Sequence, residues 1–373
     1  MKSFSIKSTN LFFKKNNYKI FQYGKEGKAY FDLFFKDKEN RFIYNLRDIY
    51  ILILFSPKFF LNLFYYRSFK LSYFKTLFSI LKVKTVITWL DNNGTYQELD
   101  KKFNDIKFFT FQNGFRSHLC LTEKKIYHSN FICFGKNDVD RYKKYGHEVK
   151  NFLPYGSLKL NLVLDNKFNI NILNDKRKDF TITIIDELPD PYIVNRNYTF
   201  ENNDQKRLSP SHRTKGTLLM LEYIKKYSNE QGIIPQVLLR YPKEETVMSS
   251  KLEKIYLEIF KNKIDLIFND EMRIKSYLAG LKADLLLGLK STLLCELFSC
   301  GKKILSLNYT NDPKFSFPIE GMYNYNGKPN YQSFKNKVEE IKNIPIDKWL
   351  ATTHKERDYI NKITKINEYK ILF

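Results

Sequence analysis

The stretch LLLGLKSTLLCELFSCGKKILSLN, residues 285–308, indicates the fold class of the chain. An apolar run ends at Gly288, a helical pattern begins at Ser291 and Thr292, and a second apolar run follows Gly301. Two apolar runs of strand length on either side of one helix are typical of a βαβ unit, in which the strands are parallel. The sequence therefore predicts a strand, a helix and a strand that belong to one parallel sheet.

The same alternation extends upstream of this unit. The predicted strands are 180–188, 235–242, 264–270, 283–289 and 302–308, and the predicted helices are 216–232, 249–262, 272–282 and 291–301. Strands that alternate with helices of this length predict a doubly wound parallel sheet.

The alternation of strands and helices occurs a second time in the N-terminal half. Apolar runs at 85–90, 106–114 and 131–135 predict strands, and the pattern at 93–103 predicts a helix. Residues 1–45 contain only short β-like runs, at 18–24, 28–36 and 41–46, which predict an irregular opening sheet or hairpin.

We therefore expect an α/β protein with two Rossmann-like domains that face a cleft, and an irregular N-terminal extension. The polar stretch 161–178 marks a connection between the domains. The expected division is a first domain at 1–160 with an aromatic and basic helical insertion, a second domain at 179–345, and closing helices at 346–373. Ligands are expected at the carboxyl ends of the strands.

Composition limits the function classes. A chain of 373 residues exceeds what one hydrophobic core usually serves, and 43% hydrophobic residues are enough for two cores. The formal net charge of +23 favours an anionic partner, although the abundance of Lys, Asn, Ile, Phe and Tyr is also what an AT-rich genome encodes. The four cysteines form no C-x-x-C pair and no ligand spacing with the histidines, so neither a zinc site nor a disulfide framework is expected. A reducing cytoplasm fits this pattern, and the N-terminus lacks the pattern of a secretory signal.

One region raises the question of a membrane. Residues 49–66 approach the length of a membrane span, but Pro57, Lys58 and Asn62 interrupt them, so a transmembrane helix is not expected. Aromatic residues and lysines alternate through residue 82, as in a surface that rests on anionic headgroups. Ordinary core helices with basic outer faces are the alternative.

Several residues of the second half suit a nucleotide. Ser291 and Thr292 fall at a helix N-terminus, where free N–H groups and the helix dipole attract a phosphate. Glu296 follows on the same helix face, where its carboxylate could accept hydrogen bonds from a ribose diol. Arg240 and Tyr241 follow an apolar strand directly, and an arginine can bind phosphate in a bidentate manner. Each feature is also compatible with a plain helix cap or turn.

A basic loop and a group of acids complete this half. His212, Arg213 and Lys215 precede Gly216, the predicted start of a helix, and so form a second candidate anion site. Asp186 ends the first strand of the second half and is the preferred catalytic carboxylate, with Glu187 and Asp190 as neighbours that could substitute.

The first half offers an acid and several amides at strand ends. Asp91 ends one predicted strand and is the second candidate for catalysis. The candidate acceptor-binding residues are Asn92, Asn93, Gln112, Asn113 and Arg116. Amide-rich loops at adjacent strand ends suit recognition of a sugar, although each could simply be a turn that ends a strand.

These parts resemble a known family. The order of VLLRYPKEE at 237–245, a helix, a strand and LLLGLKSTLLCELFSCGKKIL at 285–305 resembles the donor-binding half of GT-B glycosyltransferases. More narrowly, it is similar to bacterial enzymes that use CMP-activated sialic acid or Kdo, and to surface-carbohydrate biosynthesis proteins related to them. The resemblance is best over 180–310 and weak before 85.

In those families a His-Pro pair follows the strand and a Ser/Thr pair caps the later helix, and both bind the nucleotide. Tyr241 and Pro242 occupy the His-Pro place here, and Ser291 and Thr292 the hydroxyl place. The retaining β-Kdo transferases use an aspartate nucleophile, which the resemblance aligns with Asp186.

The resemblance implies a glycosyltransferase that moves a sugar, a CMP-linked ulosonic acid such as Kdo, from a nucleotide donor to a surface polysaccharide or lipid-linked glycan. The first domain would take the acceptor and the second the donor. No metal and no cofactor besides the nucleotide sugar is expected, and the expected location is the cytoplasm, peripheral to the inner membrane. The alternatives are a polyol-phosphate transferase or sugar epimerase on the same scaffold, and a basic nucleic-acid-binding protein, although no nucleic-acid partner is expected.

Overall fold

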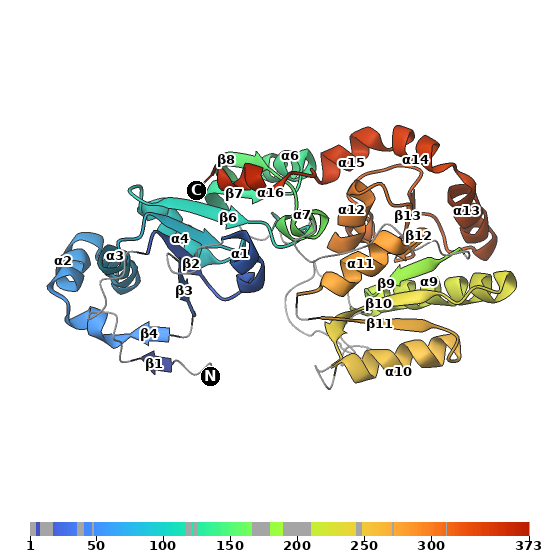
Figure 1. The fold of residues 1–373 in the computed structure, drawn as a ribbon, viewed down its shortest axis with the longest axis horizontal. Coiled ribbons are helices and arrows are strands. Elements are labelled where there is room, and N and C mark those ends of the chain that lie inside the picture. The colour runs from blue at the N-terminus through green and yellow to red at the C-terminus, as the bar shows by residue number, and fades with distance from the viewer. Residues whose placement is uncertain are drawn as a thin grey trace.

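The structure is a computed structural model, and Figure 1 shows its fold. It describes residues 5–7, 18–35, 41–46, 48–116, 121–122, 125–165, 180–188, 210–243, 248–270, 272–310 and 312–372. The described residues form two α/β domains, each built on a six-stranded parallel sheet, as expected from the alternating pattern.

The first domain contains the sheet β3-β2-β5-β6-β7-β8. Its strands are β2 (Ile20–Tyr23), β3 (Arg41–Tyr44), β5 (Thr85–Thr88), β6 (Lys107–Phe111), β7 (Tyr127–Cys133) and β8 (Glu148–Pro154). A separate two-stranded sheet pairs β1 (Ser5–Lys7) with β4 (Asp48–Tyr50). The first parallel sheet therefore begins before residue 45, where the sequence predicts an irregular extension.

Helices surround this sheet. They are α1 (Lys28–Phe34), η2 (Ile51–Phe55), α2 (Pro57–Tyr66), α3 (Phe69–Leu81), α4 (Gly94–Lys102), α6 (Lys136–Lys144) and α7 (Leu158–Leu164). The prediction of a β-like run at 28–36 is wrong, because residues 28–34 form α1. Its many aromatic residues favour a strand, but Tyr30, Phe31 and Phe34 recur with helical spacing and are buried together.

The second domain contains the sheet β11-β10-β9-β12-β13-β14. Its strands are β9 (Ile182–Ile185), β10 (Gln236–Pro242), β11 (Asp265–Asn269), β12 (Leu285–Gly288), β13 (Ile304–Leu307) and β14 (Asn324–Tyr325). Counted within the domain, the strand order is 3-2-1-4-5-6, the order of a Rossmann sheet. The five predicted strands are confirmed; β14 has only two residues and carries no pattern of its own.

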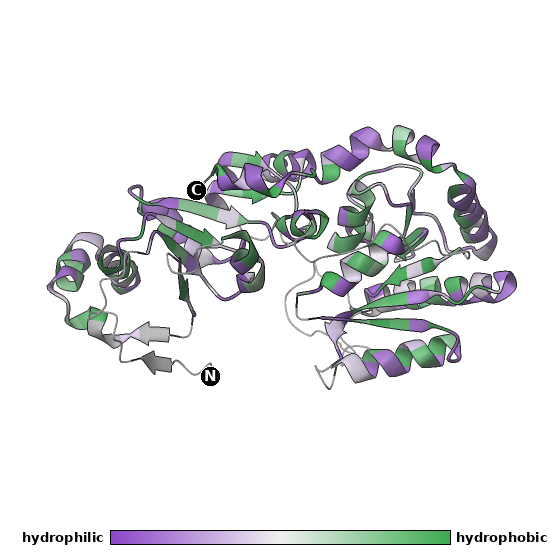
Figure 2. Ribbon diagram, viewed as in Figure 1, coloured by the Kyte–Doolittle hydropathy of each residue, from purple (hydrophilic) through white to green (hydrophobic). Residues whose placement is uncertain are grey.

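The helices of this domain are α9 (Pro210–Gln231), α10 (Met248–Phe260), α11 (Ile274–Lys282), α12 (Thr292–Ser299), η3 (Pro313–Phe315) and α13 (Tyr331–Asn343). In Figure 2 the strands of both sheets are largely coloured as hydrophobic, and the helices around them carry both colours. Each domain therefore has its own apolar core around a sheet.

The C-terminal helices connect the two domains. Helices α14 (Ile346–Thr352) and α15 (His354–Ile360) contribute Trp349 and Ile360 to the core of the second domain, whereas α16 (Ile366–Lys370) packs Ile366 and Tyr369 into a core of the first. Figure 1 shows this chain crossing back to the first sheet. The final segment therefore packs on both domains.

The aromatic and basic region forms η2, α2 and α3 at the outer end of the first domain (Figure 1). None of the helices in the described ranges is long and apolar enough to cross a membrane.

Candidate functional site

The order in which strands are added to the second sheet reverses between β9 and β12. Strands β10 and β11 lie on one side of β9, and β12, β13 and β14 lie on the other. In such sheets ligands bind outside the carboxyl ends of the strands at this switch point. Asp186 and Glu187 follow β9, and Lys290 and Ser291 follow β12. These two segments form one wall of the candidate site.

Glu187 binds the backbone that precedes α12. Its Oε1 accepts hydrogen bonds from the N–H groups of Leu289, Lys290 and Ser291, at 2.8, 3.0 and 3.0 Å. Ser291 is the N-cap of α12 and accepts the N–H of Leu293 at 3.2 Å. The predicted cap is therefore present, but the N–H groups of the loop before it, which could bind a ligand phosphate, bind the protein's own carboxylate.

Asp186 is buried and has partners on both carboxylate oxygens. Oδ2 accepts a hydrogen bond from Nε of Arg240 at 2.9 Å, and Oδ1 accepts from the hydroxyl of Tyr256 at 2.9 Å and from the N–H of Leu188 at 3.1 Å. Burial and this negative charge hold the pKa of Tyr256 well above its ordinary value, so its hydroxyl keeps the proton that it donates. Asp186 thus orients Arg240, and its catalytic role stays a prediction.

A cavity of about 340 Å³ opens in front of these residues and is lined by both domains. Its charged residues are the cations Lys159, Arg213, Arg240, Arg273 and Lys290 and the carboxylates Asp186, Glu187 and Glu296. We call it the switch-point cavity. Because five cations surround three carboxylates that are already buried, the cavity attracts an anionic ligand.

Two arginine N–H groups lack partners there. Nε of Arg213 and Nη2 of Arg240 are buried and donate to no acceptor within the part of the chain that the structure describes. A buried donor without a partner costs free energy, about 1–3 kcal/mol. Both arginines line the cavity, and arginine suits phosphate and carboxylate because its N–H groups form a planar fork.

Two lysines of the cavity are easily neutralised. Burial, and then the charge of Arg213, lowers the pKa of Lys290 to about 8. Burial lowers the pKa of Lys159 to about 8, although Glu296 opposes the shift. Lys159 Nζ lies 5.4 and 5.3 Å from the ring centroids of Tyr30 and Trp89. A bound anion would restore the charge of both lysines.

Glu296 lies on α12 at the back of the switch-point cavity. The side chain is 2% exposed, and Oε2 accepts a hydrogen bond from the hydroxyl of Tyr277 at 2.7 Å. Burial raises the pKa of this carboxyl above its ordinary value, while Ser157, Tyr277 and Lys159 oppose the shift. Its place in the cavity is compatible with contact to a ribose, which stays a prediction.

The prediction of a basic loop before Gly216 is wrong in one respect. Helix α9 begins at Pro210, a residue favoured in the first helical turn, so Arg213, Lys215 and Gly216 lie inside the helix. Thr217 Oγ1 donates to the carbonyl of Arg213 at 2.9 Å, one helical turn away. Gly216 therefore does not start the helix.

Only part of this segment reaches the site. Arg213 lines the switch-point cavity, Lys215 is exposed, and Gly216 packs so closely on the backbone of Thr310 that a Cβ would lie 3.0 Å from its nitrogen. The side chain of His212, like Asp190, lies outside the described residues. Tyr241 does not line this cavity although Arg240 does, because successive side chains of a strand point to opposite faces.

In the first domain, Asp91 organises the loop that follows β6. It forms an ion pair with Arg116, whose Nε donates to Oδ2 at 3.0 Å, and it accepts the N–H of Asn113 at 3.4 Å. Asn113 lines the switch-point cavity and accepts hydrogen bonds from Trp89 Nε1 at 2.7 Å and from Lys159 Nζ at 3.4 Å. Asp91 itself is buried outside the cavity, so its observed role is to position this loop.

Two of the other predicted acceptor residues, Asn93 and Gln112, have contacts that serve the fold. Asn93 caps α4 by accepting the N–H of Tyr96 at 2.9 Å, and Asn92 is exposed. Gln112 is buried, where it accepts the N–H of Phe134 at 3.0 Å and donates to the carbonyl of Gly114 at 3.2 Å. Of these three amides, none lines the switch-point cavity.

Several cavity residues escaped the sequence analysis, among them Lys159, Arg273, Tyr277 and Lys290. Lys290 lies beside the Ser-Thr pair in LGLKST, which is the one signal that could have identified it. The others lie in helices or helix caps whose sequence does not distinguish a cavity wall from a solvent-exposed face.

No protein-family model and no curated protein sequence matches this chain. Solved structures share its fold. UDP-GlcNAc 2-epimerase from Neisseria meningitidis has a TM-score of 0.53 and 11% identity over 95% of this chain and 97% of that one. The wall teichoic acid polymerase TagF has a TM-score of 0.52 and 11% identity over 96% and 88%. A glycosyltransferase from Rickettsia africae ESF-5 has a TM-score of 0.50 and 12% identity over 96% and 98%.

These likenesses extend over both domains and concern the fold alone. The two facing Rossmann-like domains with a ligand-sized cavity between them have the GT-B fold, as the resemblance predicted.

Proposed function

We propose that the protein is a nucleotide-sugar-dependent glycosyltransferase whose donor occupies the switch-point cavity. The observation that carries the proposal is the convergence of five cations at the switch point of the Rossmann sheet, where Arg213 and Arg240 each keep a buried N–H group without a partner in the described structure. A nucleotide phosphate would supply the anion that these groups lack.

The chemistry follows from the same charges. When the bond from the sugar to the nucleotide breaks, negative charge develops on the leaving phosphate. Preorganised Arg213, Arg240 and Lys290 would stabilise this charge in a site that largely excludes water. Transfer also needs a carboxylate, either as general base toward the acceptor hydroxyl or as nucleophile. We propose Asp186 for this role, with Asp91 as second candidate.

We propose a CMP-linked ulosonic acid such as Kdo as the donor, and a surface polysaccharide or lipid-linked glycan as the acceptor. An ulosonic acid carries a carboxylate beside the nucleotide phosphate, so it needs more cations than a neutral sugar does. The five cations of the cavity and the resemblance at 237–245 and 285–305 support this donor.

The test is calorimetric titration of the protein with CMP, UDP, GDP and dTDP, with short DNA and RNA as controls for the nucleic-acid alternative. We expect selective binding of CMP that weakens about tenfold to hundredfold in Arg240→Gln, the cost of one or two charge-assisted hydrogen bonds. Arg273→Gln keeps the Asp186 pair intact and is the second variant. Lys254→Gln removes a charge from the exposed face of α10 and is the matched control. Binding of nucleic acid without affinity for any nucleotide would refute the proposal.

A second candidate is a polyol-phosphate transferase or sugar epimerase on the same scaffold. The observation that favours it is that a teichoic acid polymerase and UDP-GlcNAc 2-epimerases have TM-scores of 0.52 and 0.50–0.53 to this chain. Product analysis separates the candidates: a glycoside, a phosphodiester or an isomerised sugar identifies a glycosyltransferase, a polyol-phosphate transferase or an epimerase, respectively.

We further propose that the outer end of the first domain rests on an anionic membrane surface. Several large apolar side chains are exposed there, namely Phe55, Phe60, Leu61, Phe64, Tyr65 and Phe69, which we call the α2 surface. Phe64 is 86% and Leu61 72% exposed. The exposed cations Lys58 and Arg67 flank them, and α2 contains no acidic residue, so the charge complements anionic headgroups.

A further inference from the structure

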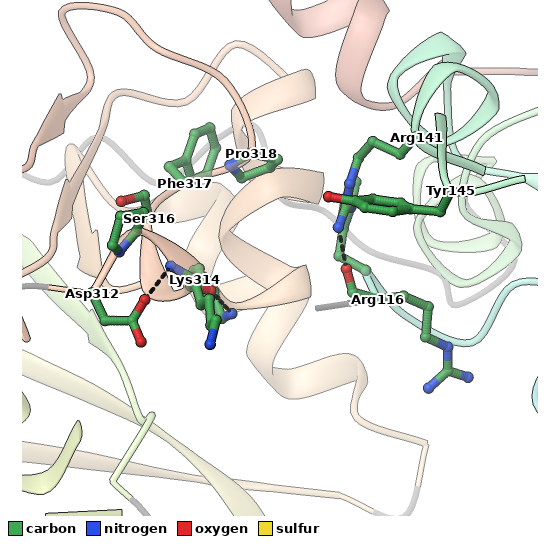
Figure 3. A pocket seen from close by; sticks show the side chains of 11 residues that line it. Arg116, Arg141, Tyr145, Asp312, Lys314, Ser316, Phe317 and Pro318 are labelled. Atoms are coloured by element: carbon green, nitrogen blue, oxygen red, sulfur yellow. Dashed lines mark hydrogen bonds between the residues drawn. The ribbon is translucent and has the colours of Figure 1, made fainter. Parts of the chain in front are cut away.

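A second cavity of about 460 Å³ lies between the domains (Figure 3). The first domain contributes the loop after β6 and Arg141 and Tyr145 at the end of α6, and the second contributes residues 312–318 around η3. Figure 3 shows Arg141 and Tyr145 facing Lys314 and Pro318 across the opening. We call it the interdomain cavity.

Cations dominate its charge, because Arg116, Arg141, Lys290 and Lys314 line the cavity together with one carboxylate, Asp312. Asp91 neutralises Arg116. Arg141 and Lys290 instead donate to neutral backbone carbonyls: Arg141 Nη2 to that of Arg116 at 2.5 Å, and Lys290 Nζ to that of Lys314. These two contacts orient the side chains and leave their charges in place.

Nearby acids compensate the cations only in part. Asp312 Oδ1 accepts the backbone N–H of Lys314 at 2.8 Å and helps to fix the turn at η3. Asp138, one turn before Arg141 on α6, is buried and does not line the cavity. Burial raises the pKa of Asp138 to about 6, while Arg141 opposes the shift. Within the described ranges, the residues that line the cavity therefore carry more positive than negative charge.

The remaining wall is apolar and partly aromatic, with Phe115, Phe317 and Pro318. An apolar wall with a few convergent charged groups is the usual construction of a site for a small ligand. Here it suits a sugar ring whose faces lie against apolar side chains while an anionic substituent meets Arg141 and Lys314.

The two cavities meet at one place. Lys290 lines both, and the loop after β6 runs along both, with Asn113 in the switch-point cavity and Phe115 in the interdomain cavity. At their boundary the N–H of Phe115 donates to Thr292 Oγ1 at 3.0 Å, across the domain interface. A ligand in each cavity would thus place its reactive end near Lys290 and Thr292.

We propose that the interdomain cavity binds the acceptor through an anionic group, a phosphate or a carboxylate carried by its sugar. The proposal rests on the proposed function, since it needs a donor in the neighbouring cavity. It assigns Arg141 and Lys314 to the acceptor and leaves the nucleotide to Arg213, Arg240 and Arg273.

The test uses the full chain saturated with CMP, so that the switch-point cavity is filled. Glucose 1-phosphate, glucuronic acid and glucose share one ring and differ in charge, and ligand-observed NMR titration measures the affinity of each. We expect one or both anions to bind more tightly than glucose, and the two anions distinguish phosphate from carboxylate. Arg141→Gln and Lys314→Gln should each weaken the better anion about tenfold or more, the effect of a lost charge-assisted hydrogen bond.

Lys144→Gln is the matched control, because it removes the same charge from an exposed position on α6. It should leave the affinity for the anions unchanged, and all three variants should bind CMP like the natural protein. Equal affinity for the anions and for glucose, or anion binding that survives both cavity substitutions, would overturn the proposal. Failure of CMP to bind would instead reject the proposed function, and the same titration without CMP would still decide the charge preference of this cavity.

Discussion

Glu187 holds a carboxylate against three consecutive backbone N–H groups at the start of α12. Such a nest is a general anion site, so the side chain substitutes within the protein for what would otherwise be a ligand anion. The carboxylate also joins β9 to β12 at the switch point of the sheet. One residue thus fixes the loop that carries Lys290 and Ser291 into the cavity.

Glu187→Ala should lower the free energy of unfolding by about 2–3 kcal/mol, because buried N–H groups lose a charged acceptor. Inorganic phosphate should then raise the melting temperature of the variant more than that of the natural protein, since phosphate can occupy the emptied nest. Thermal unfolding with and without phosphate measures both effects. Glu187→Gln, which keeps an acceptor oxygen, should lose less stability. An equal response to phosphate in all three proteins would argue against a ligand-like nest.

The lysines of the switch-point cavity should make the affinity for CMP depend on pH. Lys290 and Lys159 have pKa values lowered to about 8 by burial, and a bound phosphate raises them again. At a pH where the two lysines of the empty site are neutral, CMP binding therefore takes up protons. The affinity for CMP should fall as pH rises through 8. Each lysine contributes up to about tenfold between pH 7 and 9, while the phosphate, with a second pKa near 6, stays ionised.

Calorimetry at pH 7 and pH 9, in buffers that differ in ionisation enthalpy, measures both the affinity and the proton uptake. Lys290→Arg should flatten the profile because arginine stays charged. A CMP affinity that does not change over this range would contradict the assignment of these lysines to the nucleotide site.

At the scale of single elements, α2 is held by one face only. Phe59 is its buried aromatic residue, and Asn62 Nδ2 donates to Thr76 Oγ1 of α3 at 2.9 Å. The opposite face carries Phe60 and Phe64 into solvent. An exposed apolar patch of this kind marks an interaction site, and its flanking cations favour an anionic membrane.

Sedimentation with vesicles tests this surface. The natural protein should bind vesicles that contain an anionic lipid and not vesicles of neutral lipid alone. The double variant Leu61→Ser/Phe64→Ser should bind at least about tenfold less, because burial of each side chain is worth about 1.5–3 kcal/mol. Ile234→Ser/Ile346→Ser removes two exposed apolar side chains of the second domain and should bind normally. Equal binding by both double variants would exclude α2 as the contact.

At the scale of the whole molecule, the chain returns from the second domain to the first. The carbonyl of Lys362 passes so close to Gly156 that a Cβ there would overlap it, and Gly156 has a φ of 88° that favours glycine. Beyond this crossing, Tyr369 is fully buried in the first domain, where its hydroxyl donates to the carbonyl of Tyr155 at 2.7 Å. The relative position of the domains, and with it both cavities, depends on this crossing.

Tyr369→Ala should destabilise the first domain by about 3–5 kcal/mol, as expected for truncation of a buried aromatic side chain. Hydrogen exchange should show a loss of protection in β7, β8 and α7, while β9, β10 and β12 keep theirs. Trp349→Ala, in the core of the second domain, should give the opposite pattern. Equal loss of protection in both domains after either substitution would mean that they unfold as one unit.

Local spacing in the sequence was enough to predict the parallel sheets of β5 to β7 and β9 to β13, because the alternation of apolar runs with helices does not depend on distant neighbours. It also located the cap at Ser291 and the cavity positions of Arg213, Arg240 and Glu296. These features depend on local spacing, which the sequence displays directly.

Tertiary packing determines which distant groups meet. The aromatic run of α1 became a helix because its face packs on the first sheet, and residues 210–215 joined α9 although they carry no apolar pattern. Glu187 is about 100 residues from its N–H partners, α16 is far in sequence from the core of the first domain that it joins, and Asp91 pairs with Arg116, 25 residues away. Such partners are set by the order of strands in the sheets and by the return of the chain to the first domain. The spacing of residues within one segment carries no information about either.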